Sequence, residues 1–178
     1  EYHDKESFTV WVKFGVVMRG QDDNLDLSET AYLDDAMVVI WTTTPWTLPS
    51  NKAVVYGEDI SYGLYEVVGT PDECWVSVGD KYLLADKLAE EVFSRARLEK
   101  DQFRRVSDVP SDHLKYLGLR HPLHGAEDSQ GEWDGIRDFR AADFVTDTEG
   151  TGFVHCAPSH GLEEYELYRD LGMLEQVI

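Results

Sequence analysis

One apolar run limits the fold of this 178-residue chain more than any other part of its sequence. The run AMVVIWTT, residues 36–43, has apolar side chains at successive positions, so both faces of a strand formed here would need to be covered. We therefore expect a central strand of a sheet. Pro45 disfavours helical geometry at Thr44 and lacks a backbone donor, so the strand is expected to end there.

Other short runs rich in β-branched and aromatic residues follow along the chain, separated by clusters of Gly, Pro, Asp and Asn. Residues 7–18 (SFTVWVKFGVVM) alternate with a period of two, which is typical of a strand with one buried face. The remaining predicted strands are NKAVVY (51–56), YGLYEVV (62–68), CWVSV (74–78), FRAADFV (139–145) and GTGFVHCA (150–157).

Two helices are predicted, over residues 80–97 and 161–174. In the first, Leu84, Leu88 and Val92 recur every four residues, and Asp80 is a candidate cap. In the second, Leu167, Leu171 and Leu174 form a stripe and Gly172 marks the end. Residues 121–138 read as a long surface loop. Many strands and few helices indicate an α+β, mainly β fold: a β-barrel-like or half-open sheet decorated by a few helices, in a single domain over residues 1–178.

The net charge of −19, from 35 acidic and 16 basic side chains, excludes a free-standing, non-specific nucleic-acid binder, because such a surface repels phosphates. No apolar run is long enough to span a bilayer, so we expect no membrane association and a cytoplasmic location. The chain begins without an initiator Met, so we expect a fragment of a longer protein.

Four threonines gather where the central strand must stop. Thr42, Thr43, Thr44 and Thr47 lie within six residues, flanked by Trp41 and Trp46. Each hydroxyl is a donor and an acceptor on a short, stiff side chain, so little entropy is lost when it binds a small polar substrate or a water. The cluster therefore favours a site over the ordinary abundance of Thr in strands and turns.

A second stretch, TEGTGFVHCAPSHGLEEYEL (148–167), combines a glycine turn, a strand and a helix start. Gly150 and Gly152 permit a sharp turn or the close approach of another molecule. His155 lies in the strand, and it is either a core histidine or a site residue. Glu163 and Glu164 fall in the first helical turn, where they either stabilise the helix dipole or face a ligand.

Two other chemistries fit less well. The peptide APSHG (157–161) is one residue from a nucleophile elbow, but no histidine follows His160 to complete that order of triad. His121 and His124 are close in sequence, yet no third ligand accompanies them, so we expect no metal and no other cofactor. Hydrolysis by a positioned water suits this inventory better than covalent catalysis.

The peptides WTTTPWTLPSN (41–51) and GTGFVHCAPSHGLEEY (150–165) together resemble the two signature peptides of the editing domain of isoleucyl-tRNA synthetase, the insertion known as connective polypeptide 1 (CP1). Residues 1–14 also resemble the first strand of that insertion. The resemblance is strong over residues 1–55 and 139–172 and looser between them. The related valyl and leucyl enzymes carry Arg at the position of Thr44, which makes the isoleucyl resemblance specific.

The resemblance implies a β-barrel-like domain, cut from a larger class I synthetase, that hydrolyses valine wrongly joined to the isoleucine tRNA. Isoleucyl-tRNA synthetase is the standard example of such double-sieve editing, because one missing methylene is worth only ~1–3 kcal/mol in a binding pocket. A smaller second pocket admits valine and excludes isoleucine. The runner-up is a catalytically silent module that binds an aminoacyl-adenosine or a partner protein.

The family's roles transfer to matching residues. Thr42, Thr43 and Thr44 would bind the aminoacyl-adenosine end and orient the attacking water. His155 would be the steric sieve, and Glu164 would hold the α-ammonium where the family has Asp. The other implied substrate contacts are Trp41, Thr47, Asn51 and Gly152.

The implied partners are the 3′ end of aminoacylated tRNA(Ile), valyl-adenylate and the remainder of the parent synthetase. The isolated domain is expected to be a monomer with weak tRNA affinity, because its charge repels the phosphate backbone.

Overall fold

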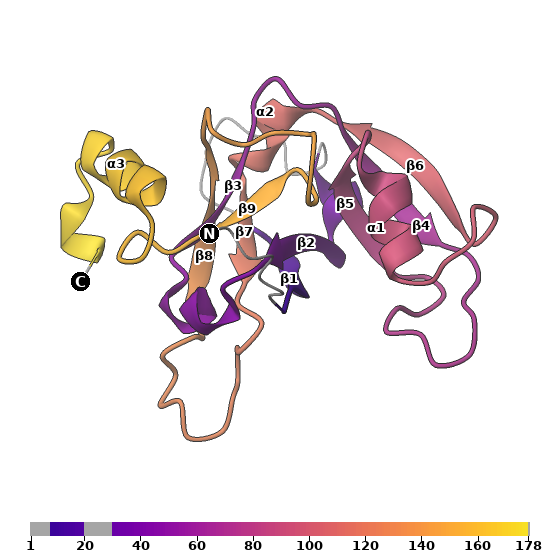
Figure 1. The fold of residues 1–178 in the computed structure, drawn as a ribbon, viewed down its shortest axis with the longest axis horizontal. Helices are drawn as coiled ribbons and strands as arrows, with labels where there is room; N and C mark the ends of the chain where they lie inside the picture. The colour runs from indigo at the N-terminus through magenta and orange to yellow at the C-terminus, as the bar shows by residue number, and fades with distance from the viewer. Residues whose placement is uncertain (1–7, 20–29, 178) are drawn as a thin grey trace, which may run out of the picture.

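The computed structural model describes residues 8–19 and 30–177, and the fold is a mixed nine-stranded sheet with a few short helices (Figure 1). The strands are β1 Val10–Met18, β2 Ala36–Thr42, β3 Ala53–Tyr56, β4 Tyr62–Val67, β5 Lys81–Ala85, β6 Phe103–Val109, β7 Leu117–Arg120, β8 Ile136–Ala141 and β9 Phe153–Cys156. The α-helices are α1 Ala89–Arg95, α2 Ser111–Leu114 and α3 Leu162–Asp170; the 3₁₀ helices are η2 Ala31–Leu33, η3 Pro45–Ser50 and η4 Leu174–Gln176.

The sheet has the order β6-β4-β5-β2-β1-β7-β8-β3-β9 and is not closed into a barrel. It curls, however, so that its last strand, β9, packs near the central strand β2 without a ladder between them. The mainly β, half-open fold expected from the sequence is thus confirmed. At the seam between β2 and β9, no backbone hydrogen-bond ladder joins the two strands.

The central position of β2 is confirmed. It pairs with β1 on one side and β5 on the other. Val38 and Ile40 point into the main core, and Val39 points into a second core beneath α1. Burial of each such side chain is worth ~1.5–3 kcal/mol relative to exposure, so β2 anchors both faces of the sheet.

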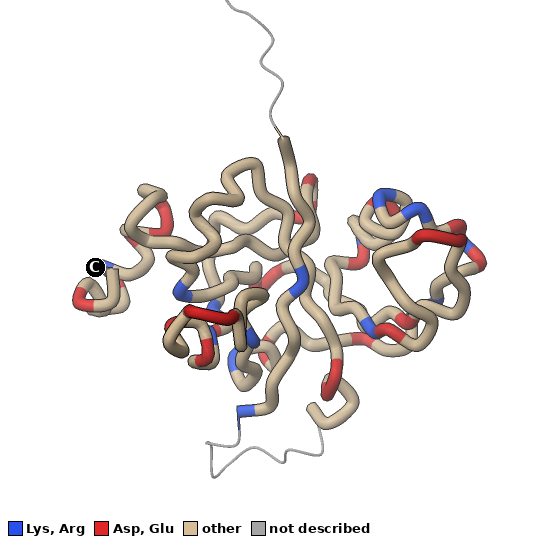
Figure 2. Tube along the Cα trace, turned by 90° about the horizontal axis from the view of Figure 1, so that it is seen from below, with Lys and Arg blue, Asp and Glu red and all other residues tan. Residues whose placement is uncertain are grey.

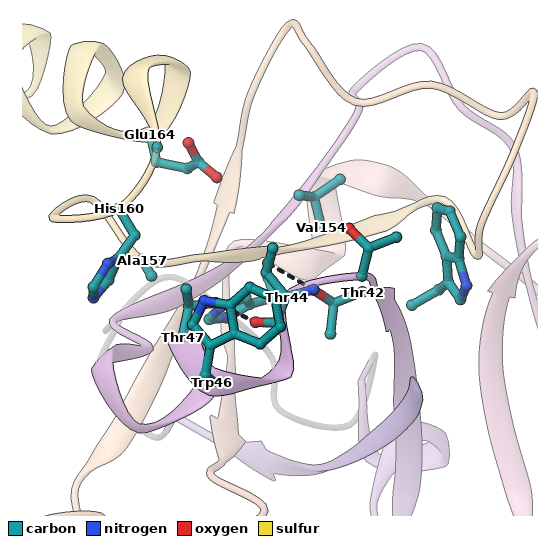
Figure 3. A pocket seen from close by; sticks show the side chains of 12 residues that line it. Thr42, Thr44, Trp46, Thr47, Val154, Ala157, His160 and Glu164 are labelled. Carbon is teal, nitrogen blue, oxygen red and sulfur yellow. Dashed lines mark hydrogen bonds between the residues drawn. The ribbon is translucent and has the colours of Figure 1, made fainter. Parts of the chain in front are cut away.

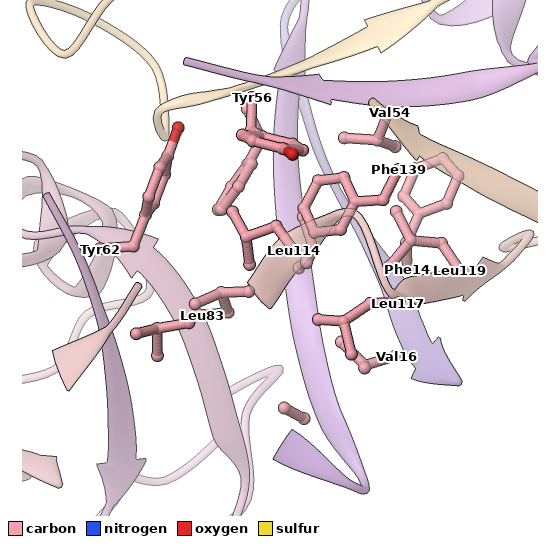
Figure 4. Close-up of a cluster of buried hydrophobic side chains, with 14 of the residues drawn as sticks. Phe14, Val16, Val54, Tyr56, Tyr62, Leu83, Leu114, Leu117, Leu119 and Phe139 are labelled. Carbon is pink, nitrogen blue, oxygen red and sulfur yellow. The ribbon is translucent and has the colours of Figure 1, made fainter. Parts of the chain in front are cut away.

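Three cores hold the molecule together. Figure 4 shows the main one, which fills the inside of the curled sheet. The second packs α1 against β4 and β5, and the third holds α3 against β3 and β9 through Tyr168. The helices α1 and α3 therefore lie at opposite ends of the sheet (Figure 1).

The helix expected over residues 80–97 was wrong in its first half, which is strand β5. Tyr82 and Leu84 enter the second core, whereas Leu83 and Ala85 enter the main core. Residues 82–85 are apolar at every position because both faces of β5 are covered. Only Ala89–Arg95 form the helix.

Three other expectations need correction. Residues 74–78 form turns, not a strand, because β4 already pairs with β5 and β6. The strand expected over 139–145 is Ile136–Ala141, in register with β3. In the last helix, Leu171 and Leu174 are exposed, and Tyr168 is the buried residue. Ser7 of the first predicted strand and residues 20–29 lie outside the described residues.

Within the described ranges, no helix is both long and apolar enough to cross a bilayer. In Figure 2 the Lys and Arg segments lie among Asp and Glu segments, and they do not form a continuous basic stripe over the described part of the chain.

Candidate active site

The two signature stretches meet in one cavity of about 350 Å³ at the seam between β2 and β9 (Figure 3). One wall comes from the end of β2 and from η3, and the opposite wall comes from β9 and the start of α3. The hydroxyl-rich peptide and the imidazole, more than 100 residues apart in sequence, thus face the same space. The lining residues are Trp41, Thr42, Thr43, Thr44, Trp46, Thr47, Val154, His155, Ala157, His160, Gly161 and Glu164.

The four threonines divide into two structural and two exposed hydroxyls. Thr42 Oγ1 accepts the Thr44 backbone N–H at 3.0 Å, which closes the turn after β2. Thr47 Oγ1 donates to the Thr44 carbonyl at 2.8 Å and so fixes the first turn of η3. Thr42 and Thr47 are buried, whereas Thr43 and Thr44 are exposed at the cavity. The Thr43 hydroxyl is therefore available to a substrate or a water, as is that of Thr44, which also lies 3.2 Å from Thr42 Oγ1.

His155 is held at both ring nitrogens. Its Nε2 lies 2.9 Å from Thr47 Oγ1, and its Nδ1 lies 2.7 Å from Asn51 Nδ2. Thr47 already donates its proton to a carbonyl, so it accepts from Nε2–H. The Asn51 amide donates to Nδ1 and to the Ala53 carbonyl at 2.7 Å. These partners assign a neutral imidazole protonated at Nε2.

Burial, with a smaller contribution from the positive charges that His121 and His160 can carry, lowers the pKa of His155 to about 4. The ring is therefore uncharged at neutral pH, with neither nitrogen free in this arrangement. A side chain in this state offers the cavity a rigid wall and no mobile proton. The geometry thus matches a steric role for His155 better than acid–base catalysis.

Protonation of His155 gives a pH prediction for stability. Its unfolded-state pKa is about 6.5, so between pH 6.5 and 4 the unfolded chain binds more protons than the folded one, and stability is lost as the pH falls. The wild type should lose about 3 kcal/mol more than His155→Gln between pH 7 and 4. Urea denaturation of both proteins at the two pH values measures this, and parallel losses would contradict it.

Two of the expected substrate contacts lie behind the cavity wall. Asn51 is only 2% exposed and orients His155, as described above. Gly152 has φ +82°, and a Cβ there would lie 2.4 Å from the Cβ of Ala85. Its carbonyl accepts the Tyr62 hydroxyl at 2.8 Å. Gly152 is thus required by packing, and it borders only a smaller adjoining hollow of about 230 Å³.

Glu164 brings a negative charge to the cavity from the first turn of α3, whose N-cap is Gly161. Its carboxylate folds back over Gly161: a Cβ added there would lie 1.7 Å from Glu164 Oε2. In the described part of the chain, no Lys or Arg forms an ion pair with Glu164. The carboxylate therefore remains available to a cation in the cavity, whereas Glu163 borders only the adjoining hollow.

Sequence reasoning missed five of the residues that line the cavity, namely Trp46, Val154, Ala157, His160 and Gly161. Trp46 is 73% exposed at its mouth, and it could have been selected because it belongs to the threonine stretch. Val154 and Ala157 lie beside His155 in sequence and carry no signal of their own. His160 also borders the cavity, and its Nε2 lies 3.3 Å from Ser50 Oγ.

Within residues 8–19 and 30–177, no three His, Cys, Asp or Glu side chains gather as metal ligands. His121 Nε2 instead contacts the Leu48 carbonyl at 2.9 Å, and His124 lies 3.3 Å from Asp134.

Relatives identify the segment. An isoleucine–tRNA ligase of Ruegeria pomeroyi is 71% identical over 178 residues, which is 100% of this chain and 17% of that protein. The isoleucine–tRNA ligase of Rhodopseudomonas palustris is 45% identical over 168 residues, or 94% of this chain and 15% of that protein. The chain thus spans about a sixth of the length of these relatives. No protein-family model matches it.

Solved structures identify the fold. The crystal structure of GlLeuRS-CP1 has a TM-score of 0.65 at 16% identity, covering 95% of this chain and 64% of that chain. The Plasmodium falciparum cytosolic leucyl-tRNA synthetase editing domain has a TM-score of 0.61 at 10% identity, covering 97% of this chain and 72% of that chain. The chain is therefore homologous over its whole length to one segment of the isoleucine–tRNA ligases, and that segment has the fold of a CP1 editing domain.

Proposed function

We propose that this chain is an editing domain that hydrolyses the ester between valine and tRNA(Ile) and also accepts valyl-adenylate. The observation that carries the proposal is the single cavity shared by two exposed threonine hydroxyls, a neutral histidine wall and an unpaired carboxylate. Its partners would be the tRNA 3′ end and the remainder of a parent synthetase, in the cytoplasm. Residues 1–178 would act as one domain, monomeric when isolated.

Each group would have one task in the reaction. The Glu164 carboxylate would bind the substrate's α-ammonium, and the ring of His155 would limit the space for the amino-acid side chain. Thr43 and Thr44 would hold a water against the ester carbonyl. The water oxygen forms a bond to the carbonyl carbon. The bond from that carbon to the ribose oxygen then breaks, and the ribose oxygen takes a proton released by the water, assisted by the neighbouring ribose hydroxyl.

Glutamate at position 164 needs a specific explanation, because the family resemblance implies Asp. The extra methylene moves a carboxylate by ~1 Å, and a misplacement of that size can cost ~100-fold in rate. The Glu164 side chain folds back over Gly161, so its carboxylate reaches less far into the cavity. This supports compensation for the extra methylene rather than loss of function. If it does not compensate, the runner-up applies: a silent module that binds aminoacyl-adenosine.

Deacylation assays with a full-length ligase that contains this segment distinguish the two proposals. We expect valyl-tRNA(Ile) to be hydrolysed at least 100-fold faster than isoleucyl-tRNA(Ile), with the segment-deleted enzyme as the control. A structure of the domain soaked with a non-hydrolysable valyl-adenosine analogue should place the valine against His155. Binding of the analogue without hydrolysis of either ester would favour the silent module.

A further inference from the structure

We infer that His121 and Trp133, in the loop between β7 and β8, are positioning residues that set the width of the editing cavity. Neither lines the cavity. Both act on η3, the six-residue 3₁₀ helix that carries Trp46 and Thr47. The inference rests on the proposed function and identifies what holds one wall of that site in place.

The two side chains donate to consecutive carbonyls at the end of η3. His121 Nδ1 accepts the Leu123 backbone N–H at 3.0 Å, so its Nε2 carries the proton, which it donates to the Leu48 carbonyl at 2.9 Å. Trp133 Nε1 donates to the Pro49 carbonyl at 3.0 Å. The Leu48 carbonyl also accepts the Asn51 backbone N–H at 3.0 Å, so His121 adds a second donor to it, and Trp133 supplies a donor to the Pro49 carbonyl at the end of the helix.

The two donors also form one rigid unit. The rings of His121 and Trp133 stack with an interplanar angle of 14° and centroids 6.0 Å apart. The His121 ring in turn meets Phe14 of the main core edge-on, with centroids 5.9 Å apart. His121 is only 2% exposed, and burial lowers its pKa, which favours the neutral ring that accepts from Leu123 and donates to Leu48. The core strand β1 is thereby connected to the end of η3.

Movement of η3 would alter the cavity in two places at once. Thr47 accepts from His155 Nε2–H, so its displacement would release the steric wall. Trp46, at the mouth of the cavity, would shift with it. A shift of ~1 Å is comparable to the length of the single methylene that distinguishes isoleucine from valine, so the loop should influence selectivity more than binding.

Substitutions in the full-length enzyme test the inference. Trp133→Phe keeps the ring stack and removes the N–H; His121→Leu removes both the donor and the acceptor, whereas His121→Gln retains a donor. Trp75→Phe is the matched control, because Trp75 lies between β4 and β5 and its ring packs edge-on against Tyr82 of the second core. We expect Trp133→Phe and His121→Leu to lower the valyl-to-isoleucyl ratio of kcat/KM about tenfold, and His121→Gln to restore part of it.

A wild-type ratio in Trp133→Phe and His121→Leu would overturn the inference, even if their melting temperatures fall. The wild-type enzyme in the same assay tests the proposed function separately. If the wild-type enzyme hydrolyses neither ester, amide hydrogen exchange tests the inference instead. The Thr47 and Asn51 amides, which close η3, should exchange at least tenfold faster in Trp133→Phe than in Trp75→Phe. Equal exchange in the two variants would likewise overturn the inference.

Discussion

Replacement of Glu164 by Gln should lower kcat/KM for hydrolysis of valyl-tRNA(Ile) about 100-fold, which corresponds to ~3 kcal/mol. The side chain keeps nearly the same shape but loses its charge, so the substrate's α-ammonium would enter the cavity without a counter-charge. Because no Lys or Arg of the described residues pairs with Glu164, the variant breaks no ion pair there. Single-turnover deacylation with the full-length enzyme measures the effect.

Glu163→Gln is the matched control for this experiment. Both glutamates lie in the first turn of α3, where a negative charge stabilises the helix by ~0.3–1 kcal/mol. Loss of helix stabilisation alone would therefore affect the two variants equally. We expect Glu163→Gln to stay within about twofold of the wild type, because Glu163 does not line the main cavity. Equal losses in both variants would remove Glu164 from substrate binding.

Glu164→Asp examines the departure from the family pattern. If the folded-back conformation over Gly161 places the carboxylate correctly, the shorter side chain at this position would be ~1 Å out of place and activity would fall. A gain in activity would instead show that glutamate is the poorer residue here. The direction of the change is read in the same assay as the Glu164→Gln result.

Sequence patterns located the site because its signals are local. The proline that ends β2 and the adjacent threonines occur within a few residues of one another, and the same is true of His155 and Glu164. Their meeting in one cavity depends on the curl of the sheet, which no local pattern reveals. Strand β6 (Phe103–Val109) was missed because it is a largely exposed edge strand with little apolar periodicity.

The roles of individual side chains were harder to predict than their positions. Asn51 and Gly152 belong to the signature peptides, yet both lie behind the cavity wall, because the direction of a side chain in a turn is decided by packing. Trp46, in contrast, faces the cavity mouth. The contact of His121 with Leu48 spans 73 residues, so no sequence spacing could have indicated it.

The largest change in selectivity is expected from His155→Ala. Removal of the ring deletes the wall that separates valine from isoleucine, so the cavity should accept the extra methylene. We expect hydrolysis of isoleucyl-tRNA(Ile) to rise about 100-fold or more, and the valyl-to-isoleucyl ratio to approach one, because the steric exclusion that separates the two esters is removed. Deacylation of both esters by the same preparation gives the ratio directly.

Loss of the ring also removes one hydrogen bond from Thr47 and one from the Asn51 amide, which costs about 1–3 kcal/mol of stability. His155→Gln separates this cost from the steric effect, because glutamine nearly preserves the volume and can hydrogen-bond to both neighbours. It should therefore retain most of the discrimination that alanine loses. If alanine slowed the hydrolysis of both esters in the same proportion, His155 would be a structural residue, and the exclusion of isoleucine would have to come from the tryptophans and threonines of the opposite wall.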